Sequence, residues 1–380
     1  MLRGSQRDLF EVPGDVVYLN TANMSPLLRS VREAGERALA QRAAPWRVTA
    51  ADWFSDVEQL RVALAGLFGT DSDGVALIPA TSYGLAIAAR NISAAPGDHV
   101  VVLAEEYPSN YYTWQRFGER TGADLVVVKR EPGQSWTDAV LARIDERTRV
   151  VAVPNVHWTN GALLDLAAVA GASRQAGAAL VIDASQSLGA MPLDLALLQP
   201  DFVVSVGYKW LLGPFGVGCL YVAEQHRGGE PLEENWINRE GSEDFTALVD
   251  YTDAYRPGAR RFDVGERPNF GLIPMALAAA EQLLDWTIAG VAASLRAVTD
   301  EIATRAAELG FNVSARDECG PHMLGIELPR DVARVLGGHL RERGIVASVR
   351  GNSLRIAPHL HTTESDIDRL LESLPRVAEA

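Results

Sequence analysis

Short apolar segments recur along residues 75–222, and stretches with a helical pattern separate most of them. The segments are rich in Val, Ile and Leu and lack the polar alternation of a strand that has one face in water. A parallel sheet covered by helices on both faces requires such strands. The sequence therefore predicts an α/β fold with a mostly parallel, doubly wound large domain. The predicted strands are residues 75–78, 100–103, 125–128, 150–153, 180–182, 202–206 and 219–222.

The pattern changes beyond about residue 268. An alanine-rich stretch predicts one long helix over residues 274–309, and short strands and helices follow it. The last helix is predicted to begin with a capping box formed by Thr363 and Asp366. We therefore predict an N-terminal arm over residues 1–15, a large domain over 16–267 and a smaller α+β domain over 268–380.

The composition excludes several classes of protein. The formal net charge of −14 is spread without long acidic runs, which argues against a nucleic-acid partner or an anionic membrane surface. No apolar run approaches the roughly 20 residues that span a bilayer. The two cysteines give no disulfide framework and no leader precedes Glu11, so we expect a cytoplasmic protein. Spacings such as CxxC or HExxH are missing, so we expect no metal site.

A lysine and an aspartate follow two of the predicted strands. Lys209 comes directly after the apolar strand 202–206 and precedes a glycine-rich bend, and Asp183 ends the strand that leads to Ser185 and Gln186. In open α/β sheets, ligands bind at the carboxyl ends of the strands. Taken singly, Lys209 is an exposed loop lysine and Asp183 a helix N-cap. Their placement at neighbouring strand ends favours a site instead.

Three motifs carry a resemblance to a known family. Asp183-Ala-Ser-Gln186, Gly207-Tyr-Lys-Trp-Leu-Leu-Gly-Pro214 and Ala80-Thr-Ser-Tyr-Gly84 resemble the class V aminotransferase family of pyridoxal 5'-phosphate (PLP) enzymes. That family includes cysteine desulfurases, isopenicillin N epimerase and kynureninase. The resemblance covers nearly the whole chain and implies the PLP-dependent transferase-like fold, fold type I, with PLP as cofactor. It is specific for the cofactor and much less specific for the reaction.

The resemblance implies a role for each motif residue. Lys209 would hold the PLP aldehyde as a Schiff base and then move the Cα proton as a neutral amine. Asp183 would pair with the pyridine nitrogen and keep it protonated, and Gln186 would bond the phenolic oxygen. Thr81 and Ser82, between a strand and a helix, would bind the phosphate, although ordinary N-capping explains them equally well.

Other residues are matched to the family more loosely. Tyr107 resembles the residue that stacks on the pyridine ring, with a core tyrosine as the alternative. Tyr208 stands where relatives present a histidine or tyrosine to the phosphate. Arg355 matches the arginine that binds the α-carboxylate of the substrate, because a guanidinium donates two parallel hydrogen bonds. A surface arginine is the alternative reading.

The remaining candidates concern the substrate and a partner subunit. His157 follows another strand, where it contacts substrate or cofactor or is a loop histidine. Asn23 lies in a turn-rich loop suited to a pocket wall. Arg267 and Asn269 lie where relatives reach into the phosphate site of the neighbouring subunit, which implies a homodimer with a shared site. The sequence departs there from the common Gly-Thr pattern of the family.

The reaction is the least determined feature. Residues 347–353, which match the loop that carries the nucleophilic cysteine of cysteine desulfurases, contain no cysteine. Cys219 lies in an apolar strand, and Cys319 precedes a different strand of the small domain. We therefore predict an aminotransferase acting on an amino acid or related amine, with a lyase or an epimerase as the alternatives. A catalytically idle PLP-binding module is a further alternative, and a dehydrogenase is disfavoured because no G-x-G-x-x-G motif follows a strand.

Overall fold

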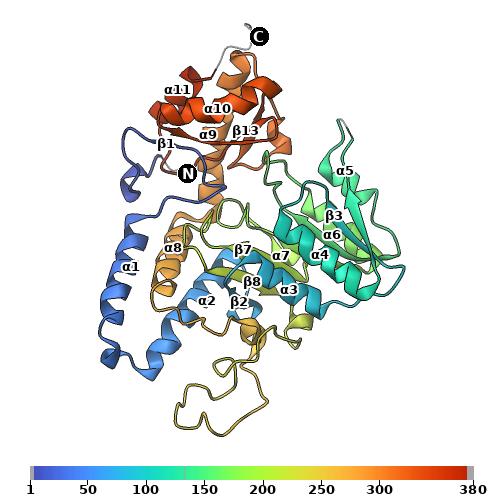
Figure 1. Cartoon of the computed structure of the whole chain (residues 1–380), viewed down its shortest axis with the longest axis vertical. Helices are drawn as coiled ribbons and strands as arrows, with labels where there is room; N and C mark the ends of the chain where they lie inside the picture. Colours follow the sequence, from blue (N-terminus) through green and yellow to red (C-terminus); the bar gives the residue numbers. More distant parts are fainter. Residues whose placement is uncertain (1–3, 132, 375–380) are drawn as a thin grey trace.

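A computed structural model describes residues 4–131 and 133–374 of the chain. Its centre is a seven-stranded sheet in which β7, β6, β5, β3 and β4 run parallel, while β8 is antiparallel to both of its neighbours (Figure 1). The predicted mostly parallel sheet is confirmed. In spatial order, the strands are β2 (Val75–Ile78), β8 (Gly218–Val222), β7 (Phe202–Val206), β6 (Ala179–Asp183), β5 (Thr148–Pro154), β3 (His99–Leu103) and β4 (Asp124–Val128).

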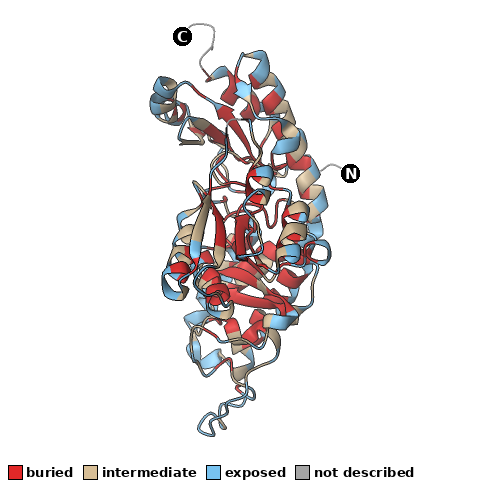
Figure 2. Cartoon of the chain, turned by 90° about the vertical axis from the view of Figure 1, so that its right-hand side faces the viewer, coloured by how far each residue is buried: buried red, intermediate tan, exposed pale blue. Residues whose placement is uncertain are grey.

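Apolar layers cover both faces of this sheet, as a doubly wound fold requires. Figure 2 shows the central strands coloured as buried. Successive residues of β3 point to opposite layers: Val100 and Val102 pack in one, and Val101 and Leu103 in the other. The buried strands therefore carry apolar residues at every position. The helices of this part are α1 (Arg29–Arg42), α2 (Ser55–Phe68), α3 (Thr81–Asn91), α4 (Pro108–Thr121), α5 (Trp136–Leu141), α6 (Leu166–Ala176), α7 (Leu195–Leu198) and α8 (Ile273–Trp286).

A smaller α+β unit has its own apolar core (Figure 1, orange to red). Its antiparallel sheet runs in the order β12 (Ser348–Arg350), β13 (Ser353–Ile356), β10 (Leu324–Glu327) and β9 (Asn312–Val313). The predicted capping box at Thr363 and Asp366 is confirmed. The helices of the unit are α9 (Ile288–Glu308), α10 (Arg330–Glu342) and α11 (Glu364–Glu372). Single-turn helices are η1 (Arg7–Leu9), η2 (Pro45–Arg47), η3 (Ala50–Trp53), η4 (Ser72–Gly74), η5 (Glu224–His226), η6 (Gly258–Phe262) and η7 (Arg316–Glu318).

Two segments belong to other units than the predicted boundaries at residues 16 and 268 assign them to. Strand β1 (Val17–Tyr18) pairs with β11 (Ile345–Val346), so it joins the smaller unit. Helix α8 packs against α1 and α2, so it belongs with the core of the large sheet. The predicted helix 274–309 is two helices, because Thr287 has a φ of +60° and its hydroxyl caps α9 at Gly290. The ends of the predicted arm and small domain, residues 1–3 and 375–380, lie outside the described residues.

The N-terminal arm packs on its own chain. Phe10 is buried between Trp286 of α8 and His359 and His361 of the smaller unit. Gln6 donates its backbone N–H to Leu360. Within the described residues, no helix is both long and apolar enough to cross a membrane.

Candidate active site

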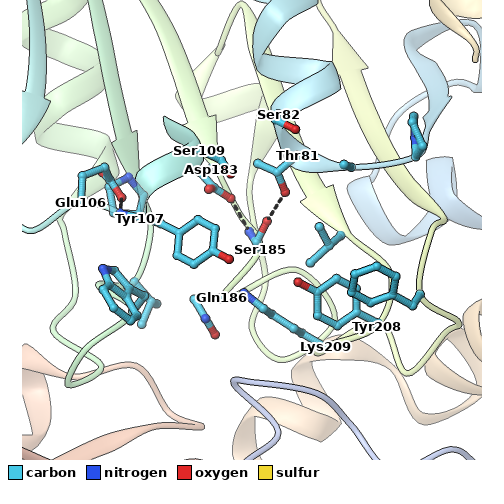
Figure 3. A pocket seen from close by; sticks show the side chains of 17 residues that line it. Thr81, Ser82, Glu106, Tyr107, Ser109, Asp183, Ser185, Gln186, Tyr208 and Lys209 are labelled. Atoms are coloured by element: carbon cyan, nitrogen blue, oxygen red, sulfur yellow. Dashed lines mark hydrogen bonds between the residues drawn. The ribbon is translucent and has the colours of Figure 1, made fainter. Parts of the chain in front are cut away.

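The carboxyl ends of the central strands surround one cavity (Figure 3). Strands β2, β5, β6 and β7 lead into its walls, and the loop after β3 completes it. Seven of the residues singled out in the sequence lie together here, although they come from widely separated parts of the chain. They are Thr81, Ser82, Tyr107, Asp183, Gln186, Tyr208 and Lys209.

Lys209 is held at the end of β7 by a closed bend. The N–H of Gly207 donates to the carbonyl of Val217 at 2.8 Å, and the N–H of Gly213 donates to the carbonyl of Gly207 at 2.9 Å. A Cβ on Gly207 would lie 2.4 Å from the Val217 oxygen, so only glycine permits this approach. The glycine-rich sequence therefore fixes where the chain leaves the sheet, and with it the position of the lysine.

The amine of Lys209 is buried and has no ion-pair partner among the described residues. Its Nζ lies 5.1 Å from the centroid of the Tyr107 ring and 5.8 Å from that of Tyr208. Burial lowers the pKa of Lys209 to about 8; the nearby Asp183 opposes this shift and the charge of Arg355 adds to it. A larger fraction of this amine than of an exposed lysine is therefore neutral and nucleophilic near neutral pH.

Asp183 ends β6 in the same cavity and is 6% exposed. Its Oδ1 accepts a hydrogen bond from the backbone N–H of Ser185 at 2.9 Å. Burial raises the pKa of Asp183, while the bonds from Ser185 and the charge of Lys209 act in the opposite direction. A buried carboxylate without a directly paired cation is costly, so this residue is suited to a cationic partner in the cavity.

Glu106 is a cavity residue that the sequence reasoning missed. Its Oε1 accepts the N–H of Tyr107 at 2.7 Å, while Oε2 is buried with no hydrogen-bond partner in the described chain. Burial and the neighbouring Asp183 raise the pKa of Glu106 to about 8, so it is mostly protonated at neutral pH. The available signal was the acidic pair Glu105-Glu106 directly after a buried strand.

The N-terminus of α3 forms another side of the cavity. Its N-cap residue, Ala80, offers no side-chain oxygen to the free N–H groups of the first turn. The hydroxyl of Thr81 is bonded to that of Ser185 at 3.0 Å, and Ser82 lies beside it (Figure 3). Free backbone donors and the helix dipole at this end suit a phosphate.

Gln186 connects the cavity to the N-terminal segment. Its Nε2 donates to the carbonyl of Ala22 at 3.0 Å, and its Oε1 accepts from the indole of Trp210 at 2.9 Å. One hydrogen of the Nε2 group is not used by these bonds. Tyr208 packs on Phe215, with 4.5 Å between ring centroids.

Arg355 lies beside the cavity on β13 and is 2% exposed. Its Nη1 donates to the carbonyl of Trp158 at 2.7 Å, and its Nη2 donates to Oδ1 of Asn20 at 3.3 Å. Burial and the charge of Arg350 lower the pKa of Arg355 to about 10. Trp158, which the sequence reasoning also missed, lines the cavity and meets Tyr107 edge to face at 5.8 Å.

Arg355 and four other predicted site residues do not line this cavity. The His157 ring stacks on Trp136 at 5.1 Å and shares a hydrogen bond with Thr159. Asn23 is exposed in its loop. Arg267 was expected to reach a neighbouring subunit, but its guanidinium is buried and bonded to Asp263, to Asn238 and to the Ile237 carbonyl. Asn269 is exposed, and its side chain accepts from the N–H groups of Gly271 and Leu272 before α8.

The cavity residues fit PLP. A buried amine suits the aldehyde, an aspartate suits the ring nitrogen, and a tyrosine suits the flat ring. The free N–H groups of α3 suit the phosphate.

The class V aminotransferase model, described as "Aminotransferase class-V", matches residues 17–370. The chain belongs to this family. It is therefore a PLP-dependent enzyme of fold type I. One relative is the "uncharacterized aminotransferase YcbU" of Bacillus subtilis (strain 168), 27% identical over 85% of both chains. Another is the isopenicillin N epimerase of Streptomyces clavuligerus, 29% identical over 94% of both chains.

Solved structures show the same fold. The structure of C-DES with glycine covalently linked to its PLP cofactor superposes with a TM-score of 0.86. The match covers 97% of this chain and 98% of that chain at 20% sequence identity. At this identity the likeness concerns the fold alone.

Proposed function

We propose that the protein is a PLP-dependent aminotransferase that acts on an amino acid. The observation that carries this proposal is the burial of Lys209 in one cavity with Asp183 and over the ring of Tyr107, at a pKa lowered to about 8. An amine in this state can form a bond to an aldehyde and can also accept a proton at neutral pH.

The cofactor site is built from the cavity residues. When bound, PLP supplies an aldehyde that condenses with the substrate amine and a conjugated ring that accepts the electrons left at Cα. Asp183 would hold the ring nitrogen in its protonated form, and the face of Tyr107 would support the ring. Thr81, Ser82 and the first N–H groups of α3 would hold the phosphate.

The substrate would be held between the two units of the chain. Arg355, which has no carboxylate partner in the described residues, is suited to the α-carboxylate. The neutral amine of Lys209 would accept the proton from Cα of the substrate. It would then return this proton to the cofactor carbon that carried the aldehyde. A protonated Glu106 beside Asp183 would leave that aspartate as the charged group facing the ring nitrogen.

Persulfide chemistry has no support in the cysteines. Cys219 and Cys319 are both buried, and burial raises the pKa of each thiol.

An epimerase is the second candidate, because the Streptomyces relative matches nearly the whole of both chains and the same proton transfer at Cα begins both reactions. An idle PLP-binding module is less well supported, since buried Lys209, Asp183 and Arg355 lie together.

We also propose a homodimer. The loop between η5 and η6 extends away from the body at the end opposite the smaller unit (Figure 1). It carries Val249 and Tyr251, which are 77% and 97% exposed, and Trp46 elsewhere is 80% exposed. Apolar side chains of this size favour burial against another surface. A cytoplasmic location stays a prediction from the sequence.

Product analysis tests the reaction. The PLP-loaded protein is mixed with a panel of L-amino acids, and cofactor and products are followed by mass spectrometry. An aminotransferase yields pyridoxamine phosphate with an equivalent amount of keto acid. Recovery of the D-amino acid would establish the epimerase instead, and release of ammonia with pyruvate would establish a lyase. A protein that takes up no PLP would overturn the proposal.

A further inference from the structure

Two arginines approach the substrate side of the cavity, and only one is used by the proposed function. Arg355 lies on β13 opposite Ser348, and Arg350 lies two residues farther along β12. Residues two apart on one strand share a face, and cross-strand partners share it too. Arg350 and Arg355 therefore project from the same face of the smaller sheet.

Both guanidinium groups meet the same tryptophan. The Cζ of Arg350 lies 5.9 Å from the centroid of the Trp158 ring, and Nη1 of Arg355 donates to the backbone carbonyl of that residue. Trp158 in turn lines the Lys209 cavity and packs on Tyr107. The indole of Trp158 is fixed by a 2.7 Å hydrogen bond to the carbonyl of Glu105. Arg350 thus lies behind the cavity wall, in contact with Trp158, which itself packs on Tyr107.

Neither arginine is neutralised by the part of the chain that the structure describes. No carboxylate lies within ion-pair distance of Arg350 or Arg355, and the Nε of each is buried without a hydrogen-bond partner. Arg355 is buried and Arg350 is half-buried. The buried arginines Arg61 and Arg267 are, in contrast, paired with Asp263. In a chain with 49 acidic and 35 basic residues, two adjacent unpaired guanidinium groups indicate that their counter-charge comes from a ligand.

We propose that Arg350 binds a second carboxylate of the substrate, so that the substrate class is an α-amino acid with a carboxylate in its side chain. The inference rests on the proposed function, in which Arg355 holds the α-carboxylate. The guanidinium forks of Arg350 and Arg355 would each bind one carboxylate, and Trp158 would lie against the carbon chain between them. A substrate with a neutral side chain would leave the charge of Arg350 without a partner beside the site. Such a substrate would therefore bind less well.

Binding of simple acids tests the carboxylate sites without any reaction. Succinate, glutarate and butyrate are titrated into the holoenzyme and followed by calorimetry. We expect a dicarboxylate to bind at least 10-fold more tightly than butyrate. Arg350→Met should weaken the better dicarboxylate by about 10- to 100-fold and leave butyrate within about 3-fold, since one charged hydrogen-bonding group is lost. Arg355→Met should weaken both ligands.

Substrate preference is the second measurement. We expect the ratio of kcat/KM for aspartate or glutamate to that for asparagine or glutamine to fall at least 10-fold in Arg350→Met and to be partly kept in Arg350→Lys. Arg341→Met, which changes an exposed arginine of α10, is the matched control and should leave the ratio unchanged. Urea denaturation of each variant shows whether the fold is kept.

The outcomes separate the two proposals. An enzyme that converts neutral amino acids as well as acidic ones, with a ratio that Arg350→Met does not change, overturns the inference and leaves the aminotransferase standing. Dicarboxylate binding that depends on Arg350, in a protein that converts no amino acid, supports the carboxylate site at Arg350 but overturns the proposed function and, with it, the substrate class. Dissociation of a dimer in Arg350→Met, without loss of dicarboxylate binding, would assign the arginine to a subunit contact and overturn the inference.

Discussion

Lys209 is one of only two lysines in the chain, and the other, Lys129, is exposed. The burial of Lys209 lowers its pKa and makes its amine reactive, whereas an exposed lysine is almost fully charged at neutral pH. This pair of lysines makes the assignment of the cofactor-binding amine unusually simple, because a covalent adduct has only two side chains to choose between.

We expect Lys209→Arg to lose the borohydride-stable PLP adduct, because a guanidinium does not deprotonate. Activity should fall by about 100- to 10,000-fold, the usual contribution of a positioned proton-transfer group. Lys129→Arg is the control and should keep both the PLP adduct and the activity. In the wild type, the rate at which added PLP forms the adduct should rise with pH up to about 8 and then level off. An adduct on Lys129 in peptide mass spectra would contradict the assignment.

The buried carboxyl group of Glu106 makes the stability of the fold depend on pH. Its pKa is raised from 4.5 to about 8, so the folded protein holds a proton that the unfolded chain releases between these values. This group therefore makes the fold less stable as pH rises from about 4.5 to about 8. Glutamine resembles the protonated acid, so Glu106→Gln should match the wild type in urea denaturation at pH 4.5 and exceed it at pH 8. Equal differences at both pH values would show that Glu106 is ionised in the fold.

At the scale of elements, a buried ion cluster fixes the segment before α8. Asp263 pairs with Arg61 of α2 at 2.6 Å and with Arg267 at 3.0 Å, and its Oδ1 also accepts the N–H of Leu77 in β2. Glycine and proline in residues 256–268 predict a hinge, but these contacts hold the segment to α2 and β2. The pairing holds the Arg267 guanidinium inside its own chain.

We expect Asp263→Ala to destabilise the protein by about 3–5 kcal/mol, because buried Arg267 would lose its counter-charge and buried Arg61 would keep only Glu58. Glu119→Gln, which breaks the exposed i,i+3 pair of Glu119 with Arg116, should cost at most about 1 kcal/mol. Urea denaturation of the two variants and the wild type at pH 7 measures both changes in unfolding free energy. A small effect of Asp263→Ala would mean that water or a nearby acid such as Glu58 compensates the charge.

At the scale of the whole molecule, three buried histidines lie where the N-terminal arm, the large sheet and the smaller unit meet. Nε2 of His322 contacts the carbonyl of Gln186 at 2.5 Å, and Nε2 of His361 contacts that of Tyr18 at 2.9 Å. Neither ring nitrogen of His359 has a hydrogen-bond partner in the described chain. Burial lowers the pKa of all three, to about 4 for His322 and His361.

Acid should therefore loosen this junction. A histidine whose pKa is lowered by folding takes up its proton more readily in the unfolded chain, so stability falls as pH drops from about 6.5 toward 4. We expect His359→Phe to reduce this fall, because phenylalanine fits the surrounding rings of Phe10, Trp210 and Trp286 and cannot be protonated. Denaturation midpoints at pH 7 and pH 4.5 check this. An unchanged difference between the two midpoints would rule out His359 as a contributor.

The sequence alone determined the features that depend on neighbouring residues. Apolar runs without alternation predicted the strands of a covered parallel sheet, and the placement of Lys209 and Asp183 after neighbouring strands predicted a site there. Asp183 was found in the same way, because it ends a strand that local periodicity reveals. Thr81 and Tyr107 were matched through the resemblance to the family. Family resemblance then supplied PLP.

The tertiary structure decided what depends on contacts between distant segments. Glu106 and Trp158 line the cavity because the fold brings the loops after β3 and β5 together. His157 does not line it, because its ring stacks on Trp136. The pairing of β1 with β11 and the packing of α8 on α2 were likewise hidden, since each joins residues more than 200 positions apart. Local pattern fixes an element and the face it buries, but its neighbours are chosen by the burial and charge pairing of the whole chain.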